Sequence, residues 1–233
     1  MEVATRRRGR PPRNEVDGRD ALLRAATRAF ARVGFERADL RGIAADAGVS
    51  PNLVRVHFGS KAALWTGCLD RLTAAVAPSL AAVQGLANEH AHRPLSARLR
   101  DAIMAAIAIY DEHPDVRDFV TMLAHESPER AALVTDRLLR PAYDAGVGLI
   151  TAGIEAGVIR SSHPALFFVL LHSAISQPPA FGALLNRLAP DIDPADARRH
   201  LTDSVVASFL HRGDDPQATD PISSNLKPIG EEP

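Results

Sequence analysis

The sequence predicts an all-α fold. Over most of the 233 residues, apolar side chains recur every three or four positions, and a proline or a small polar residue precedes many of these runs. No stretch shows a comparably strong alternation of apolar and polar residues, which a half-buried strand would need. We therefore expect a small three-helix unit at the N-terminus and a larger helical domain behind it.

Residues 1–16 predict a disordered basic arm. The segment TRRRGRPPR has no apolar residue that could be buried. Within it, Arg8-Gly9-Arg10-Pro11 resembles the core of an AT-hook, whose arginines enter a narrow minor groove. A disordered tail that touches phosphates nonspecifically explains these residues equally well. In both cases Arg8 and Arg10 would add salt-dependent affinity for DNA.

The three-helix unit spans residues 17–60. Asp17-Gly18-Arg19-Asp20 resembles a capping box that opens the first helix, and Gly34 ends it. Between them, an apolar stripe at helical spacing consists of Leu22, Ala26, Ala29, Phe30 and Val33. The shared core of the unit is predicted to contain Leu22, Phe30, Ile43, Val49, Val54 and Phe58.

Residues 39–61 predict a helix-turn-helix. Asp39 can cap the first of its helices, and Gly48 is the residue type that ends a helix in a left-handed conformation. Ser50-Pro51 then starts a second helix, because the N–H that proline lacks would be unpaired there anyway. This second helix runs to about Phe58, and Gly59-Ser60 closes it and caps the next one.

The second helix of this motif is suited to the DNA major groove. Val54 and Phe58 can bury one face, which leaves Asn52, Leu53, Arg55 and Val56 pointing outward. Arginine can pair with guanine and asparagine with adenine, and aliphatic groups can contact thymine methyls. We predict DNA contacts from Arg41, Pro51, Asn52, Leu53, Arg55, Val56, His57 and Lys61, the last two to phosphates. The alternative is an ordinary helical hairpin whose outward residues are merely solvated.

Residues 19–69 resemble the DNA-binding domain of the tetracycline-repressor (TetR-type) family. The matching residues are Ala25-Ala26, Phe30, Gly34-Phe35, Ile43-Ala44, Ala47-Gly48-Val49-Ser50, His57-Phe58, Ser60-Lys61 and Leu64. Three positions depart from the family. Arg55 stands where a DNA-contacting tyrosine is usual, Asp39 where serine or threonine is frequent, and Gly42 where a carboxylate is usual. Arg55 should move contacts toward phosphate or guanine.

Composition separates a basic end from an acidic remainder. Residues 1–61 carry 13 Lys and Arg against 7 Asp and Glu, a net +6, and the remaining residues carry a net −7. A single cysteine, Cys68, excludes an internal disulfide and fits a reducing compartment, so we expect a cytoplasmic protein. We find no apolar run of membrane-spanning length and no secretion leader.

Residues 61–212 predict the larger helical domain. A long fourth helix follows Ser60, belongs to both halves of the chain, and should be interrupted near Pro78. Further helices are expected at about 94–113, 114–126, 128–157, 163–177, 180–189 and 194–211. The segment ALFFVLLHSAI, residues 165–175, predicts a wholly buried helix. Residues 213–233 hold five acidic residues, one lysine and four prolines, which predicts a disordered acidic tail.

The larger domain shows no catalytic constellation. Its histidines lack metal-ligand spacing, and no nucleophile stands beside a base, so we expect neither an enzyme nor a cofactor or metal. The family resemblance implies that this domain binds a small effector and forms a homodimer. By position, the candidates for effector contact are Met104, Ile107, Tyr110, Met122, His125, Tyr143, Phe168 and His172. We expect helices 163–177 and 194–211 to form the dimer interface as a four-helix bundle.

The expected function is sequence-specific transcriptional regulation, most simply by a ligand-responsive repressor that binds a pseudo-palindromic operator as a homodimer. Two alternatives stay open. One is an effector-independent architectural or activating DNA-binding protein that uses the basic arm. The other is an enzyme with an accessory DNA-binding head.

Overall fold

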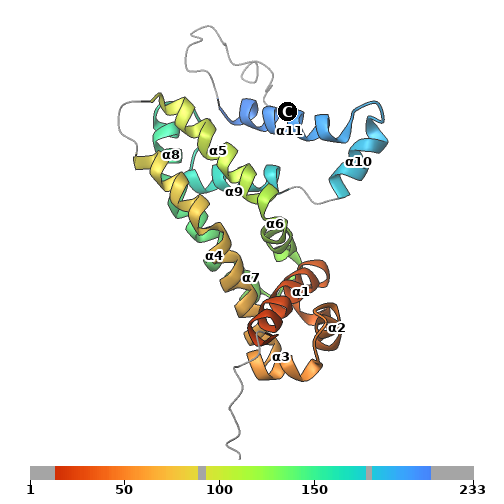
Figure 1. Cartoon of the computed structure of the whole chain (residues 1–233). Coiled ribbons are helices and arrows are strands. Elements are labelled where there is room, and N and C mark those ends of the chain that lie inside the picture. Colours follow the sequence, from red (N-terminus) through yellow and green to blue (C-terminus); the bar gives the residue numbers. More distant parts are fainter. Residues whose placement is uncertain (1–13, 89–92, 177–179, 211–233) are drawn as a thin grey trace, which may run out of the picture.

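The computed structural model describes residues 14–88, 93–176 and 180–210, and every regular element in these ranges is helical. Arg8 and Arg10 of the basic arm lie outside the described residues, as does the acidic tail. The predicted all-α fold is confirmed. Figure 1 shows an elongated molecule, with the first three helices gathered at one end and the last three at the other.

The first three helices, called the head below, are α1 (Asn14–Arg37), α2 (Leu40–Asp46) and α3 (Pro51–Phe58). Helix α1 begins three residues before the predicted capping box. Gly34 was predicted to end the first helix. It has a φ of 81°, and this positive value interrupts the helical backbone of α1 at that residue. All six predicted core residues pack together, with Leu22 and Phe30 fully buried.

Helix α4 (Lys61–Asn88) runs from the head along most of the molecule (Figure 1). The predicted interruption near Pro78 is wrong, because the helix continues through this residue. Proline removes one backbone hydrogen bond, but Ala74 and Pro78 are exposed, so water can satisfy the carbonyl that is left without a partner. Packing of α4 against α1, α5 and α8 then holds the helix together.

The remaining helices form the body. They are α5 (Leu95–Glu112), α6 (Pro114–Thr121), α7 (Pro128–Val134), α8 (Arg140–Glu155), α9 (Pro164–Ile175), α10 (Ala180–Leu188) and α11 (Pro194–Phe209). A short 3-10 turn, Met122–His125, follows α6, and a π-helical turn, Thr135–Leu139, joins α7 to α8. The helix predicted to reach Glu126 therefore ends at Thr121.

One glycine in the body fixes the distance between neighbouring helices. A Cβ on Gly153 of α8 would lie 2.8 Å from Ile159 Cδ1 and 2.9 Å from Leu99 Cδ1, so a larger side chain does not fit. The absence of a side chain at Gly153 therefore lets Leu99 of α5 pack directly against α8.

The core is continuous from the head into the body. One cluster of buried side chains includes Leu22 of α1, Trp65 and Val76 of α4, Phe119 of α6 and Leu138 of the π-helical turn. A second cluster fills the far end of the body between α5, α8, α9 and α11. A displacement of α4, α6 or the π-helical turn can therefore be transmitted to the head through side chains that are packed against one another.

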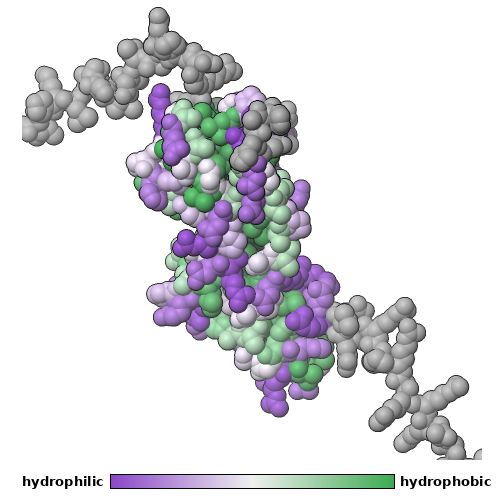
Figure 2. Space-filling model, turned by 90° about the vertical axis from the view of Figure 1, so that its left-hand side faces the viewer, coloured by the Kyte–Doolittle hydropathy of each residue, from purple (hydrophilic) through white to green (hydrophobic). Residues whose placement is uncertain are grey.

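Helix α9 is not wholly buried, contrary to the sequence-based prediction. Phe167 and Leu171 are buried, but Leu166, Val169 and Leu170 are 55–60% exposed. The sequence does not distinguish the two faces of this helix, because residues 165–171 are all apolar and both faces carry them. On the side of the molecule drawn in Figure 2, polar and apolar residues are interspersed over head and body. Among the described residues, no helix has the length and apolarity needed to cross a membrane.

Candidate nucleic-acid interface, head–body junction and body cavity

The helix-turn-helix is confirmed by its local hydrogen bonds. The Asp39 carboxylate accepts from the backbone N–H groups of Arg41 (3.3 Å) and Gly42 (2.9 Å), and these bonds lower the pKa of Asp39. Gly48 has a φ of 68° in the turn, and Val49 N–H donates to the Ala44 carbonyl at 3.0 Å. Asp39 therefore caps α2 in spite of its departure from the family pattern.

Helix α3 starts at Pro51 and is held by its neighbours. Ser50 occupies the N-cap position without a side-chain hydrogen bond, while Leu53 N–H donates to the Ser50 carbonyl at 2.9 Å. Val54 is buried, and Gly59 (φ 74°) ends the helix. Ser60 then accepts from Ala63 N–H at 3.1 Å and caps α4, as predicted. These contacts fix the orientation of α3 on the head.

The outward face of α3 carries three of the four residues predicted for it. Asn52, Arg55 and Val56 are exposed, and Val56 reaches 67%. Leu53 does not point outward as predicted: it is half-buried, packs on the head core, and its Cδ2 lies 3.1 Å from where a Cβ on Gly18 would be. The reason is that α1 begins before the predicted capping box and places Gly18 against α3.

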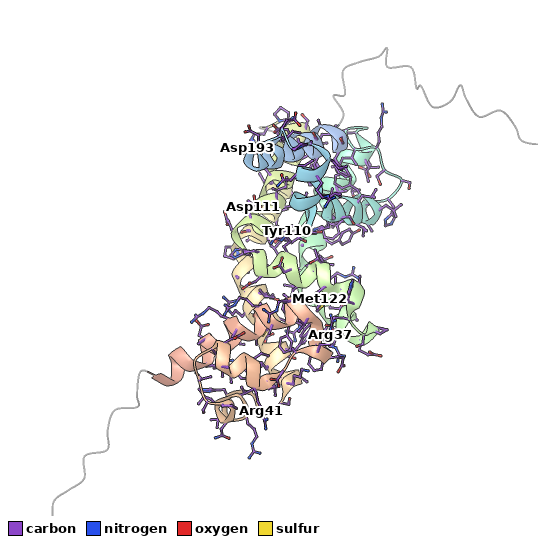
Figure 3. The ribbon with its side chains drawn as sticks, turned by 90° about the vertical axis from the view of Figure 1, so that its right-hand side faces the viewer. Arg37, Arg41, Tyr110, Asp111, Met122 and Asp193 are labelled. Atoms are coloured by element: carbon purple, nitrogen blue, oxygen red, sulfur yellow. The ribbon has the colours of Figure 1, made fainter. Side chains whose placement is uncertain are left out.

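Four further predicted contact residues surround this face. Pro51 and Arg41 are exposed, and Figure 3 shows Arg41 at the end of the molecule remote from the body. Lys61 Nζ donates to the Glu36 carbonyl at 3.1 Å and lies 4.7 Å from the centre of the Phe35 ring. His57 is half-buried, and its Nε2 is buried without a hydrogen-bond partner.

The head meets the body at a carboxylate that sequence reasoning did not identify. Glu126 follows the 3-10 turn, its side chain is only 3% exposed, and its Oε1 accepts from the backbone N–H of Phe35 at 2.7 Å. Arg130 donates from Nε to Glu126 Oε2 at 2.8 Å and also pairs with Glu36 of the head. Its guanidinium carbon lies 4.0 Å from the centre of the Phe35 ring.

Gly34 makes this junction possible. Besides its positive φ, a Cβ at this position would lie 3.1 Å from Glu126 Oε1 and 3.3 Å from Met122 Sδ. Figure 3 labels Met122 of the body and Arg37 of the head in the region where the two parts meet. Gly34-Phe35 is one of the residue pairs by which the sequence resembles the TetR-type family. Glu126, which accepts the hydrogen bond from Phe35, lies 91 residues further along the chain, and no local pattern in the sequence marks it.

Trp65 packs at the same junction. Its ring lies 5.0 Å from Phe30, 5.6 Å from Phe35 and 4.9 Å from Phe119, measured between ring centres. Cys68 of the same helix is buried, and burial raises the pKa of its thiol to about 12. A buried thiol with a raised pKa acts as a packing group and not as a reactive nucleophile.

A narrow cavity of about 80 Å³ lies inside the body. Helices α4, α5, α6, α8 and α9 and the π-helical turn all contribute to its wall. Three predicted effector residues line it: Tyr110, Phe168 and His172. Tyr143 does not line the cavity, but the centre of its ring lies 5.3 Å from that of Phe168.

The other four predicted effector residues do not line this cavity. Met104 is 44% exposed, and Ile107 packs on the second core cluster. Met122 and His125 belong to the head–body junction. The sequence-based selection favoured methionine, aromatic and histidine residues, whereas most of the wall is aliphatic. An aliphatic wall has no signature that distinguishes it from an ordinary helical core.

Two family descriptions match the sequence. Residues 22–66 match the bacterial regulatory proteins of the tetR family, and residues 94–213 match the tetracyclin repressor-like C-terminal domain. A comparison with curated proteins finds no match.

Several solved structures share the fold. The hemolysin II transcriptional regulator HlyIIR is 14% identical, with a TM-score of 0.58, and the match covers 85% of this chain and 99% of that one. A TetR-like transcriptional regulator from Rhodococcus sp. RHA1 is 20% identical, with a TM-score of 0.54 and coverage of 84% and 96%. FadR from Bacillus subtilis, solved with stearoyl-CoA, is 16% identical, with a TM-score of 0.54 and coverage of 82% and 98%.

The two family matches cover both the head and the body of the molecule. The N-terminal match covers the helix-turn-helix with its exposed α3 face, and the C-terminal match covers the body that encloses the cavity. The chain belongs to the TetR family of bacterial regulatory proteins and is a DNA-binding transcriptional regulator.

Proposed function

We propose that this protein is a ligand-responsive repressor that binds a pseudo-palindromic operator as a homodimer. The observation that carries the proposal is the pairing, in one chain, of an exposed α3 face with an internal cavity in the body. Helices α4 and α6 line that cavity, and both also pack against α1 of the head. A ligand that moves them would move the head.

DNA recognition is assigned to the outward face of α3. Arg55 can donate two hydrogen bonds to a guanine, Asn52 can pair with an adenine, and Val56 can contact a thymine methyl. Arg41, Lys61 and His57 surround this face and are assigned to phosphates, together with Arg8 and Arg10 of the basic arm. Pro51 and Leu53 are assigned to positioning the helix. Leu53 does so from its half-buried place against α1.

Homodimerisation follows from the size of the reading element. Helix α3 has eight residues and can cover only a few base pairs, so two copies related by a twofold axis are needed for a specific operator. We assign the interface to α9 and α11. Support comes from Leu166, Val169 and Leu170, which leave an apolar strip of α9 on the surface of a single chain.

The proposed switch is a change in the spacing of the two heads. An effector in the cavity would displace α6 and α4, and α6 leads through the 3-10 turn to Glu126, the acceptor of the Phe35 N–H. Coupling between effector and DNA affinity should be about 1–3 kcal/mol and reciprocal. FadR from Bacillus subtilis, which shares the fold, was solved in complex with stearoyl-CoA. The long apolar acyl chain of that ligand supports an apolar effector for this protein as well.

Selection from a random duplex pool tests the proposal. The full-length protein should enrich a sequence with two inverted half-sites about one helical turn apart. Sedimentation of the protein on that duplex should then show two chains for each site, or a multiple of two. Enrichment of a single half-site bound by one chain would contradict the homodimer, and failure to enrich any sequence would contradict specific recognition.

A further inference from the structure

The wall of the body cavity is almost entirely apolar. Of the described residues that line it, Tyr110 and His172 are the only ones with polar side chains, and none is Asp, Glu, Lys or Arg. The aliphatic part of the wall comes mainly from valine, leucine and isoleucine of α4, α5 and α8. A charged group placed here would lose its hydration without gaining an opposite charge.

Tyr110 and His172 form one hydrogen-bonded pair in this wall. Tyr110 belongs to α5 and His172 to α9, and the tyrosine oxygen lies 2.6 Å from His172 Nδ1. Burial lowers the pKa of His172 to about 4 and raises the pKa of Tyr110, so both side chains are uncharged at neutral pH. Figure 3 shows Tyr110 in the body, between the junction and the last helices.

We infer that this cavity takes a neutral, mainly apolar molecule with one hydrogen-bonding group, which docks against the Tyr110–His172 pair. This inference rests on the proposed function, since it names the class of effector. Anions such as free carboxylates, and cations such as amines, are excluded from the cavity itself, because nothing in the described wall can neutralise them.

The pair can bind either kind of hydrogen-bonding group. If the tyrosine O–H donates to His172 Nδ1, the proton of the neutral ring is on Nε2, which then donates to a ligand carbonyl. If Nδ1–H donates instead, the tyrosine O–H is free to donate and Nε2 accepts from a ligand hydroxyl. A ketone, ester, amide, alcohol or phenol therefore satisfies the pair.

The size of the cavity adds a mechanical consequence. At about 80 Å³, it is smaller than the apolar cavity of about 150 Å³ that holds benzene in another protein. A ligand with more than a few heavy atoms must therefore push the wall outward. Val116 and Val120 of α6 belong to that wall, so widening acts on the helix that leads to the head–body junction.

The test uses four one-ring molecules of similar size: ethylbenzene, acetophenone, benzoate and benzylammonium. Binding of each to the full-length protein is measured by isothermal titration calorimetry without DNA. Ethylbenzene and acetophenone should bind, whereas the two ions should bind at least about tenfold more weakly than acetophenone, because their charge would be buried without a partner.

Two sets of variants test whether the molecules bind in this cavity and against this pair. In the double variant Tyr110→Phe/His172→Phe, acetophenone should lose about fivefold in affinity, because its carbonyl has no donor, while ethylbenzene is unaffected. Tyr110→Phe/His172→Leu serves if the first double variant does not fold, because it also removes both polar groups of the wall. Ala106→Leu fills the cavity and should abolish binding of both neutral molecules. Ala105→Leu, one position earlier on α5 and outside the wall, should retain it.

The outcomes separate this inference from the proposed function. Benzoate or benzylammonium binding as tightly as acetophenone would overturn the ligand class, and so would binding of neither neutral molecule. Equal affinity of acetophenone in the wild type and the double variant would overturn the role of the pair. If acetophenone binds as expected but leaves operator affinity unchanged at saturation, the ligand class stands and the switch fails.

Discussion

The side chain of Glu126 accepts a hydrogen bond from the backbone N–H of Phe35, across the boundary between body and head, at 2.7 Å. The carboxylate is nearly inaccessible to water, and its other oxygen accepts from Arg130. A buried acceptor that serves a backbone donor and a guanidinium is costly to remove, because both donors lose their partner. This contact therefore joins the body to the DNA-binding head.

Replacing Glu126 with Ala should lower the free energy of unfolding by about 2–4 kcal/mol, because Phe35 N–H and Arg130 both lose an acceptor. Urea denaturation followed by far-UV circular dichroism measures this loss. Glu129→Ala is the matched control, since Glu129 is exposed on α7 one turn away. Similar losses in the two variants would show that the junction contact is energetically unimportant.

Replacing Gly34 with Ala should destabilise the protein by more than about 1 kcal/mol, because alanine is strained at a φ of 81° and its Cβ would crowd Glu126. Gly148→Ala is the matched comparison. Gly148 lies inside α8, has no neighbour within 4 Å of an added Cβ, and should gain about 0.5–1 kcal/mol. Thermal unfolding of the two variants should therefore shift in opposite directions, and a shift in the same direction would contradict this account of Gly34.

The stability of the protein should fall in acid partly through His172. Its pKa is about 4 in the folded protein and about 6.5 when unfolded, so the unfolded chain binds more protons between these values. The stabilisation is complete above pH 6.5 and is lost as the pH falls toward 4, with about 1–2 kcal/mol gone by pH 5. Urea midpoints at pH 7 and pH 5 measure the loss.

His172→Phe isolates this contribution from the other titrating groups. The difference between wild type and variant should change by about 1–2 kcal/mol between pH 7 and pH 5. Tyr110→Phe leaves His172 in place and should keep most of the acid sensitivity. A constant difference across this range would mean that His172 has the same pKa in the folded and the unfolded protein, and would contradict its burial in the cavity wall.

The α9 strip should control assembly. Val169→Glu places a charge on the exposed apolar face of α9 and should turn a dimer into a monomer in sedimentation experiments. Leu133→Glu is the control. Leu133 is also an exposed apolar residue (42%), but it belongs to α7 and not to α9. Dissociation by Leu133→Glu with a stable Val169→Glu dimer would move the interface away from α9.

Local signals in the sequence predicted the head well. Asp39, Gly48, Ser50-Pro51 and Gly59 are start and stop signals whose effect lies within a few residues, so the boundaries of α2 and α3 could be predicted from them. Leu53 was misplaced because its environment depends on where α1 begins, and that start lies in the polar segment before the apolar stripe.

The body was predicted less completely, for two physical reasons. At Pro78, tertiary packing along α4 overrides a local signal for interruption. Contacts between distant residues, such as Glu126 with Phe35 and Tyr110 with His172, leave no periodic trace in one sequence. Individual cavity residues could be guessed by type, as Tyr110, Phe168 and His172 were, but an aliphatic wall resembles any other core.

The most direct measurement is operator selection from a random duplex pool, performed in parallel with wild type, Arg55→Ala and Lys61→Ala. We predict that wild type enriches two inverted half-sites, and that Arg55→Ala relaxes the preference at one symmetric position in each half-site at a cost of about 1–3 kcal/mol. Lys61→Ala should weaken operator and random DNA alike. An unchanged base preference in Arg55→Ala would contradict the claim that the outward face of α3 reads DNA.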